Sequence, residues 1–365
     1  EITLGPSNPM GQTQKAGSGS QQLQVFGNYY AGVTEERAAE IARLQAKDVI
    51  ATYYSLDAAP VASQRIEDFD ATLIERLVEE KVLDALGDPG FQISLRKAQM
   101  SAASTEEEGD YETLARLLGE RAKRNIRPIR ASIDRAIETV DSLDESALQG
   151  LTMAWAVGGF RPASGFILDA LNFLETMWST LPHDNLPEGR AWLDHLDMLG
   201  LARYSAGGFK LRPLNDLLQT QVPGYFSVGM TQDEANLMNQ AAEEVRPGLT
   251  FTMVAHELKP QVLRLPYSGV PSLEMELGTF ADEERQRIIH MAREQGRLEQ
   301  IDSSLAEAMD AEIAKRPCMA LVQRWYDQIP DMVQFTGAGV AVAFVVAQKH
   351  KTPLSTDKLE ELLPH

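Results

Sequence analysis

Residues Asp88–Val140 read DPGFQISLRKAQMSAASTEEEGDYETLARLLGERAKRNIRPIRASIDRAIETV. The Pro89-Gly90 turn ends one helix, and residues 92–103 then form a helix rich in small side chains. An acidic break at 106–109 separates it from two periodic helices that meet at a basic junction. Consecutive helices, each apolar on one side, predict that this part of the chain is a helical domain.

Two more helices are predicted before this stretch. Thr34 followed by Glu35 is a helix N-cap with an acid in the first turn, and this helix should end near Tyr54. The next helix has Ile66, Phe69, Leu73 and Leu77 at three- and four-residue spacing. We therefore expect a helical domain over residues 34–147.

The second half of the chain, 148–349, is predicted to be an α+β domain. Leu201–Leu211 contains two short strand-like runs around Gly207-Gly208, after a helix, which is typical of a winged-helix hairpin within about 148–215. Its wing would present three cations, Arg203, Lys210 and Arg212. DNA binding and protein contact are both open to such a wing, and the acidic residues of the preceding helix favour protein contact.

Further along, residues 249–277 are β-prone and broken by prolines, so we expect a small sheet or an extended interaction segment there. Residues 280–310 should return to helix, a short strand is expected at 332–336, and residues 350–365 form a charged tail. The fold class is therefore mainly α (α+β): a helical N-terminal domain, then a helical domain with a winged-helix-like hairpin and a small sheet.

The N-terminal region is expected to be an arm outside the core. Residues 1–9 precede Met10, and we interpret them as an added leader, followed by a flexible arm over 10–33. Within the arm, Gln22–Tyr30 alternates like a strand, and a lone strand needs a ladder partner. We expect a homo-oligomer contact through Leu23, Val25, Phe26, Tyr29 and Tyr30. Docking onto residues 249–277 of the same chain is the alternative.

The composition limits the class of partner. The net charge of −19 disfavours nucleic acid or an anionic membrane as a partner of the whole chain. The single cysteine, Cys318, excludes an internal disulfide, which fits the cytoplasm. No run of 18 apolar residues occurs, so we do not expect a transmembrane protein.

A local basic cluster stands out in this acidic chain, and it comprises Arg116, Arg121, Lys123, Arg124, Arg127, Arg130 and Arg135. The simpler interpretation is pairing with nearby acids, in which Asp134 and Glu138 are spaced to meet Arg130 and Arg135. The alternative is an anion or nucleic-acid contact through this cluster, Arg135 excepted.

No sequence motif names a reaction. Neither a P-loop nor a G-x-S-x-G motif is present, and Cys318 lies in an apolar setting that favours packing. His290 and Glu294 share a helix face, but two ligands do not make a zinc site, so we expect no metal and no cofactor. Asp68 and Asp70 are expected to be solvated. Catalysis by dispersed carboxylates stays an alternative.

Several segments resemble a group of uncharacterised bacterial proteins: QLQVFGNYYAGVTEERAAEIA from Gln22, QRIEDFDATLIERL from Gln64, DPGFQ with AQMSAA, DYETLARLLGERAKR from Asp110, and Trp325 with FTGAGVAVA. The resemblance covers most of 10–349, and such proteins occur near mobile-element and anti-phage loci. It implies a cytoplasmic defence role as a sensor or adaptor, with a phage-derived or co-encoded protein as partner. We therefore expect a non-enzymatic recognition or scaffolding protein, and the alternative is a protein that binds or cleaves nucleic acid.

Overall fold

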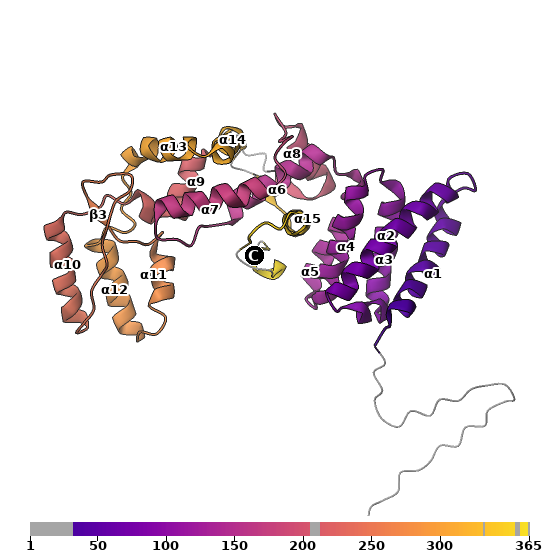
Figure 1. Ribbon diagram of the computed structural model, residues 1–365, viewed down its shortest axis with the longest axis horizontal. Coiled ribbons are helices and arrows are strands. Elements are labelled where there is room, and N and C mark those ends of the chain that lie inside the picture. Colours follow the sequence, from indigo (N-terminus) through magenta and orange to yellow (C-terminus); the bar gives the residue numbers. More distant parts are fainter. Residues whose placement is uncertain (1–31, 205–211, 331–332, 355–357, 364–365) are drawn as a thin grey trace, which may run out of the picture.

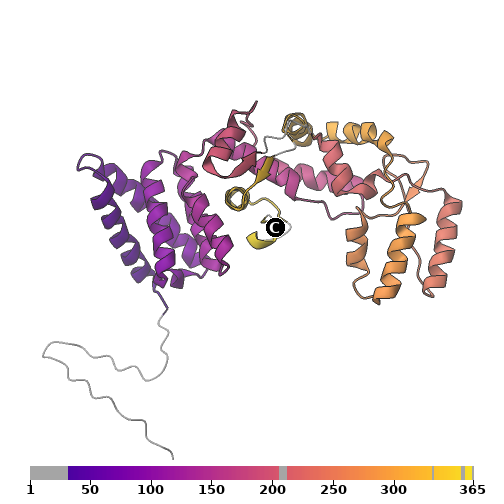
Figure 2. The same cartoon turned by 180° about the vertical axis from the view of Figure 1, so that it is seen from behind.

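The computed structural model describes residues 32–204, 212–330, 333–354 and 358–363. Within these ranges the chain is mainly helical and has two small antiparallel strand pairs, which confirms the predicted fold class. The molecule is elongated, with one helical group at each end of the long axis and further helices between them (Figure 1). Figure 2 shows the same arrangement from behind.

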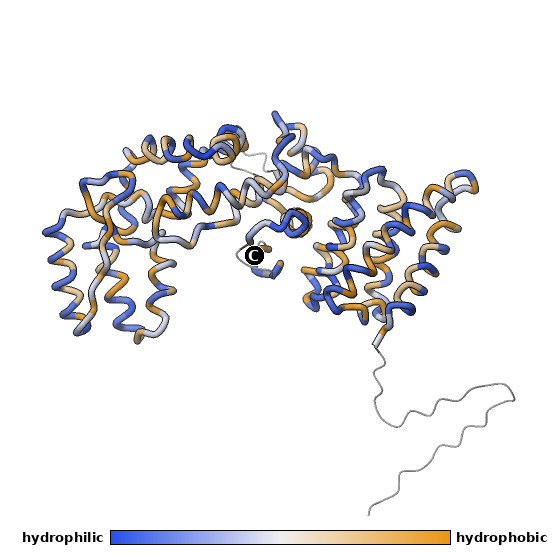
Figure 3. Tube along the Cα trace, in the orientation of Figure 1, coloured by the Kyte–Doolittle hydropathy of each residue, from blue (hydrophilic) through white to orange (hydrophobic). Residues whose placement is uncertain are grey.

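Five helices form the bundle at the N-terminal end, and their bounds are α1 Glu35–Tyr53, α2 Ala59–Glu79, α3 Pro89–Ser104, α4 Glu108–Lys123 and α5 Arg127–Ile137. Helix α1 begins as predicted, because the Thr34 side chain accepts a hydrogen bond from the backbone N–H of Arg37. The predicted apolar stripe of α2 is buried against α1, α3 and α4. Apolar and polar residues alternate along these helices in Figure 3, as expected for helices buried on one side.

The central region contains α6 Glu145–Gly159, α7 Ile167–Thr180, α8 Ala191–Leu199, α9 Leu214–Gln221, α13 Ala306–Ala314, α14 Pro317–Tyr326 and α15 Gly337–Lys349. Helix α15 comes late in the chain but packs on α4, α5 and α6. One buried apolar cluster therefore contains residues from Ala38 to Leu359 and crosses residue 147. The predicted division at residue 147 stays a prediction.

The group at the other end has its own apolar core. Its helices are α10 Gln232–Val245, α11 Val270–Glu276 and α12 Asp282–Glu294. Thr231 and Glu234 form a capping box at the start of α10. Five short 3₁₀ turns complete the helical elements: η1 Leu83–Gly87, η2 Val140–Ser142, η3 Pro223–Phe226, η4 Ser303–Leu305 and η5 Leu359–Glu361.

One expectation for this half needs correction. The predicted helix over 280–310 is interrupted after α12, because the chain turns at Gly296 and at Arg297, which has φ of 52°. The small sheet expected within 249–277 forms as a two-residue ladder, β2 Val254–Ala255 with β3 Leu263–Arg264, and the end of the segment is α11.

The strand predicted at 201–204 forms as β1 Ala202–Tyr204, and the structure shows a distant partner for it. It pairs antiparallel with β4 Val333–Phe335, the short strand expected before α15. The second strand of the predicted hairpin, with Lys210, lies outside the described residues. The winged-helix interpretation therefore stays a prediction.

Candidate functional site

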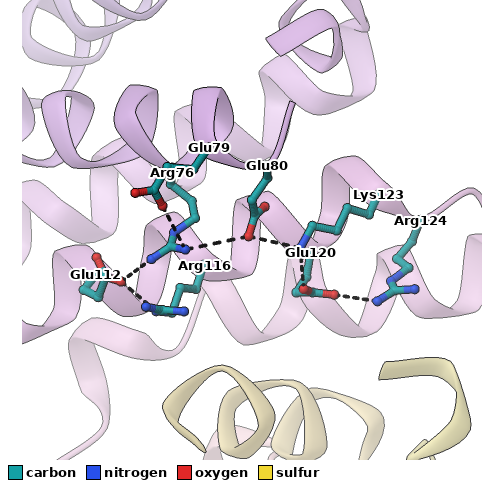
Figure 4. Close-up of polar contacts among 8 residues, drawn as sticks. All are labelled: Arg76, Glu79, Glu80, Glu112, Arg116, Glu120, Lys123 and Arg124. Carbon is teal, nitrogen blue, oxygen red and sulfur yellow. Dashed lines mark hydrogen bonds and ion pairs between the residues drawn. The ribbon is translucent and has the colours of Figure 1, made fainter. Parts of the chain in front are cut away.

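The basic cluster lies on α4 and α5, and most of its described members contact acids. Arg76 from α2 reaches Glu112 on α4 with 2.7 Å between Nη2 and Oε1, and Arg116 approaches the same oxygen at 2.6 Å (Figure 4). Four cations alternate here with four carboxylates: Arg76, Arg116, Lys123 and Arg124 with Glu79, Glu80, Glu112 and Glu120. We call these eight residues the charge network, and their formal charges cancel.

Glu120 is the most buried member of the network. Its carboxylate is 1% exposed and lies 2.9 Å from Lys123 Nζ and 2.7 Å from Arg124 Nη2. Lys123 also lies 3.0 Å from Glu80 Oε1, which links α4 to the end of α2. A buried carboxylate needs cationic partners such as Lys123 and Arg124 to remain ionised, so the charge network has a structural role.

Arg121 is separate from this network and is buried as well. Its side chain donates from Nε to Asp134 Oδ1 at 2.7 Å and from Nη2 to the Gly90 carbonyl at 2.9 Å. The guanidinium also lies 5.8 Å from the centre of the Phe91 ring. Asp134 thus pairs with Arg121 and not, as spacing suggested, with Arg130. These bonds join α4, α5 and the start of α3.

The remaining cations of the cluster are more accessible. Arg127 is exposed and has no partner among the described residues, whereas Arg130 donates from Nε to the Arg124 carbonyl at 2.6 Å. Arg135 donates to the Leu199 carbonyl at 2.8 Å and lies 3.4 Å from Glu138, the acid predicted for it. An anion contact through this cluster stays a prediction.

Arg203, one of the three predicted wing cations, lies close to Arg135. Both side chains line a surface hollow of about 520 Å³ at the N-terminus of α15, together with Ser132 and Asp197. Arg212 lies elsewhere and donates from Nη2 to Thr220 Oγ1 at 3.3 Å. The structure therefore brings one wing residue and one cluster residue together, which the sequence did not suggest.

A buried acid in the bundle was missed. Asp68 is exposed as expected, but Asp70 is only 8% exposed, so the expectation that both are solvated is wrong for Asp70. Burial raises the pKa of Asp70 to about 7. The Gln99 amide donates to the carboxylate at 3.0 and 3.1 Å, which lowers the pKa but does not offset the burial. Asp70 lies four residues after Ile66 and three before Leu73, on the buried side of α2, and this spacing was the available signal.

His256 and Cys318 are of residue types that often act in catalysis, and both are buried. His256 is buried, its Nε2 lies 3.1 Å from the Ser227 carbonyl, and its Nδ1 accepts from the backbone N–H of Leu258 at 3.2 Å. Burial lowers the pKa of His256 to about 4, so the ring is neutral near pH 7. Burial also raises the pKa of the Cys318 thiol above its ordinary value, which disfavours a reactive thiolate.

Buried Arg264 links the α10–α12 group to the central region. It forms a two-point pair with Glu257, with Nε–Oε2 and Nη2–Oε1 distances of 2.9 and 3.0 Å, and donates to the Gly165 carbonyl at 2.7 Å. Glu257 in turn accepts from the backbone N–H of Ile167, at the start of α7. This pair was missed, because nothing in the sequence around Arg264 indicated its burial.

Helix α7 exposes two aromatic side chains. Phe166, the N-cap residue of α7, and Phe173, within the helix, are 47% and 42% exposed. Contiguous exposed apolar patches mark protein contacts, whereas single exposed apolar side chains are common on folded surfaces. The five residues predicted for an oligomer contact, Leu23, Val25, Phe26, Tyr29 and Tyr30, lie outside the described residues.

The described residues contain no group of three His, Cys, Asp or Glu side chains placed to hold a metal ion. None of the described helices combines the length and the apolar character that a membrane crossing requires. No curated protein and no solved structure matches the chain. The chain belongs to an uncharacterised protein family, whose model matches residues 32–357.

Proposed function

We propose that the protein is a non-enzymatic recognition or scaffolding protein that acts by contacting other proteins. The observation that carries this proposal is the pair of exposed phenylalanines, Phe166 and Phe173, on α7. Aromatic side chains bury a large area at little cost in conformational entropy, so they are common anchors of protein interfaces. The elongated shape supports the proposal, because it leaves α7 between two separate helical groups (Figure 1).

The setting that we propose is bacterial defence in the cytoplasm, with a phage-derived or co-encoded protein as the partner. Self-assembly through the N-terminal arm belongs to the same proposal. The support is the resemblance of several segments to proteins encoded near anti-phage loci.

A plaque assay tests this proposal. Cells carrying the native locus should resist phage, and a Phe166→Ser/Phe173→Ser variant should lose resistance while accumulating to the same level. Leu237→Ser on α10 is the matched control, since Leu237 is also exposed but lies in the other helical group. Equal resistance in all three strains would contradict a role for this face of α7.

The second candidate is binding or cleavage of nucleic acid, and two observations favour it. Arg127 is exposed without a described partner, and Arg135 and Arg203 line one hollow. An Arg127→Gln/Arg203→Gln variant should then weaken DNA or RNA binding, and wild-type affinity should fall steeply as salt rises. Absence of binding at low salt would exclude this candidate. Arg121 should stay unchanged in such tests, because it is buried and joins three helices.

A further inference from the structure

The turn between α1 and α2 exposes several apolar side chains. We call residues 51–61, which join the end of α1 to the start of α2, the tip. Tyr53 and Val61 are each 55% exposed, and Leu56 is 93% exposed. The tip also exposes Ala51, Ala58 and Pro60. Because these residues belong to one short turn, they form a local apolar surface, which is typical of a protein contact.

The tip is held in shape by hydrogen bonds and by the residues beneath it. The backbone N–H groups of Ala58 and Ala59 both donate to the Ser55 carbonyl, at 3.1 and 2.9 Å. Tyr54 packs on a small apolar cluster, separate from the main core, that comprises Ala46, Val49, Ala62, Ile66 and Ala103. Leu56 is therefore exposed on a closed turn, where burial against a partner would stabilise a complex.

The chemistry of the tip favours an uncharged apolar partner. Asp57 is its only charged residue, so the tip has no cation to meet a phosphate or an anionic membrane. Each copy of the chain has a net charge of −19, so two copies approach at the lowest electrostatic cost where both surfaces are uncharged. Residues 16–31 of the arm contain no charged residue and include Leu23, Val25, Phe26, Tyr29 and Tyr30. The arm and the tip therefore match in charge and in apolar character.

The arm of the same copy is attached too far away to cover the tip. Val33 lies at η1, where its backbone N–H donates to Asp84 Oδ1 at 2.6 Å. The start of α1 and the tip lie at opposite ends of the bundle (Figure 1), and the 19 residues of α1 span about 28 Å. Tyr29 precedes Val33 by four residues, which reach about 14 Å at full extension. The whole apolar segment of the arm therefore cannot lie on its own tip, whereas the arm of a second copy has no such limit.

We propose that the uncharged arm of one copy docks on the tip of a second copy. The apolar side chains of the arm cover Leu56 and its neighbours in the tip, so that both surfaces leave water together. This inference rests on the self-assembly part of the proposed function, and it names the surface that the arm contacts. The exposed phenylalanines of α7 stay available for a different partner.

Sedimentation of the full chain over a range of concentrations tests the contact. The wild type should self-associate, and Leu56→Ser/Val61→Ser should weaken the association about tenfold or more. Both residues are exposed, so this variant should keep the melting temperature of the wild type. Phe166→Ser/Phe173→Ser is the matched control, because it removes exposed apolar side chains on α7, and it should associate like the wild type.

The same measurement separates this inference from the self-assembly on which it rests. If deletion of the arm abolishes association but Leu56→Ser/Val61→Ser does not, self-assembly through the arm stands and docking on the tip is wrong. Association lost in the α7 variant but kept in the tip variant would also overturn the proposal. A wild type that stays a monomer of 40.3 kDa up to about 100 μM would contradict both docking and self-assembly.

Disulfide crosslinking shows which residues meet and whether they come from two copies. Gly27→Cys in the arm and Ala58→Cys in the tip keep the large apolar side chains, and the natural Cys318 is buried. The two single variants, mixed and oxidised, should give a disulfide-linked dimer. Ala71→Cys, exposed on α2 away from the tip, replaces Ala58→Cys as the control and should give none.

Two other crosslinking patterns would overturn the proposal. Dimers that link only Gly27→Cys to itself would mean that arms pair with each other. An internal disulfide in a chain that carries both Gly27→Cys and Ala58→Cys, with no linked dimer, would mean that each arm docks on its own tip.

Discussion

Asp70 holds a carboxyl group inside the bundle with one amide as its polar partner. Gln99 donates to it, and the Gln99 Oε1 atom itself is buried without a hydrogen bond. A protonated Asp70, or an asparagine in its place, adds a donor that this oxygen lacks. The ionised form has to be accommodated where burial opposes charge.

We therefore predict that Asp70 makes the protein less stable as pH rises. Its folded pKa of about 7 lies above the ordinary value of 3.8, so the folded state binds the extra proton between these values. This contribution to stability is fully present below about pH 4 and is lost as pH rises through about 7. It is on the order of 2 kcal/mol or more. The Asp70→Asn variant should lack it.

Urea unfolding of both proteins at pH 5 and pH 8 measures the effect. The difference between variant and wild type removes the contributions of all other carboxylates. The free energy of unfolding of Asp70→Asn minus that of the wild type should be larger at pH 8 than at pH 5. A difference that does not change between the two pH values would show that Asp70 titrates normally.

Glu120 and Glu79 belong to the same charge network but differ in burial. Glu120 is enclosed with two cations, whereas Glu79 is exposed and lies 3.4 Å from Arg76. Glu120→Gln should cost about 3 kcal/mol of unfolding free energy, because it leaves the buried ends of two cations with less compensation. Glu79→Gln should cost less than about 0.5 kcal/mol. Similar losses in chemical denaturation would mean that Glu120 is solvated.

The acids that pair with the cations of the basic cluster were only partly predictable from the sequence. The sequence indicated that the basic cluster would meet acids, and Glu138 does lie beside Arg135. It did not indicate that Asp134 pairs with Arg121 or that Glu80 reaches Lys123. Local spacing identifies neighbours on one helix, whereas these pairs depend on how α2, α4 and α5 pack.

At the scale of elements, helix starts were the most predictable feature. Thr34 accepts a hydrogen bond from the helix that it was expected to cap, and Asp144 and Thr231 cap α6 and α10 in the same way. A cap is a local interaction, so its signal lies within a few residues. Strand partners were not predictable in this way, since β1 pairs with β4 across about 130 residues.

Helix α15 approaches β1 through a glycine, which gives a prediction about packing. A Cβ at Gly339 would stand 2.1 Å from the Leu201 carbonyl oxygen, a backbone atom that cannot move cheaply. Gly339→Ala should therefore cost about 1–3 kcal/mol. Gly158→Ala is the matched control, because its helical Cβ meets nothing, and it should be neutral or stabilising by up to about 1 kcal/mol.

Thermal unfolding of the two glycine variants provides the measurement. Gly339→Ala should lower the melting temperature, whereas Gly158→Ala should leave it unchanged or raise it. If Gly339→Ala were also stabilising, the close approach of α15 to β1 would be wrong.

At the scale of the whole molecule, the Arg264–Glu257 pair joins the α10–α12 group to α7. Glu257→Gln should leave the buried Arg264 under-compensated and weaken the charge-assisted hydrogen bond at the start of α7. We expect faster amide hydrogen exchange in α10, α11 and α12 and unchanged exchange in the bundle. Lys315→Gln removes the exposed cation of a pair with Glu312 and should change neither region. Uniformly faster exchange would contradict a local role for Glu257.

The mainly helical fold class was predictable from composition and periodicity, because many helices carry one-sided apolar stripes. The position of α15 against the bundle was not predictable, since its residues are apolar on all sides and do not indicate which helices it packs on. Likewise, Phe166 and Phe173 lie in a strongly apolar run, and the sequence does not indicate which residues of this run are buried and which are exposed. Exposure of single residues follows from packing across the whole chain.

Site-specific photo-crosslinking tests the central proposal, contact with another protein through α7, most directly. A photoreactive phenylalanine analogue would replace Phe173 in one strain and Leu237 in another, and both strains would be irradiated with and without phage infection. The account predicts a discrete crosslinked protein from position 173 and none from position 237. No crosslink at 173, or the same pattern from both positions, would contradict it.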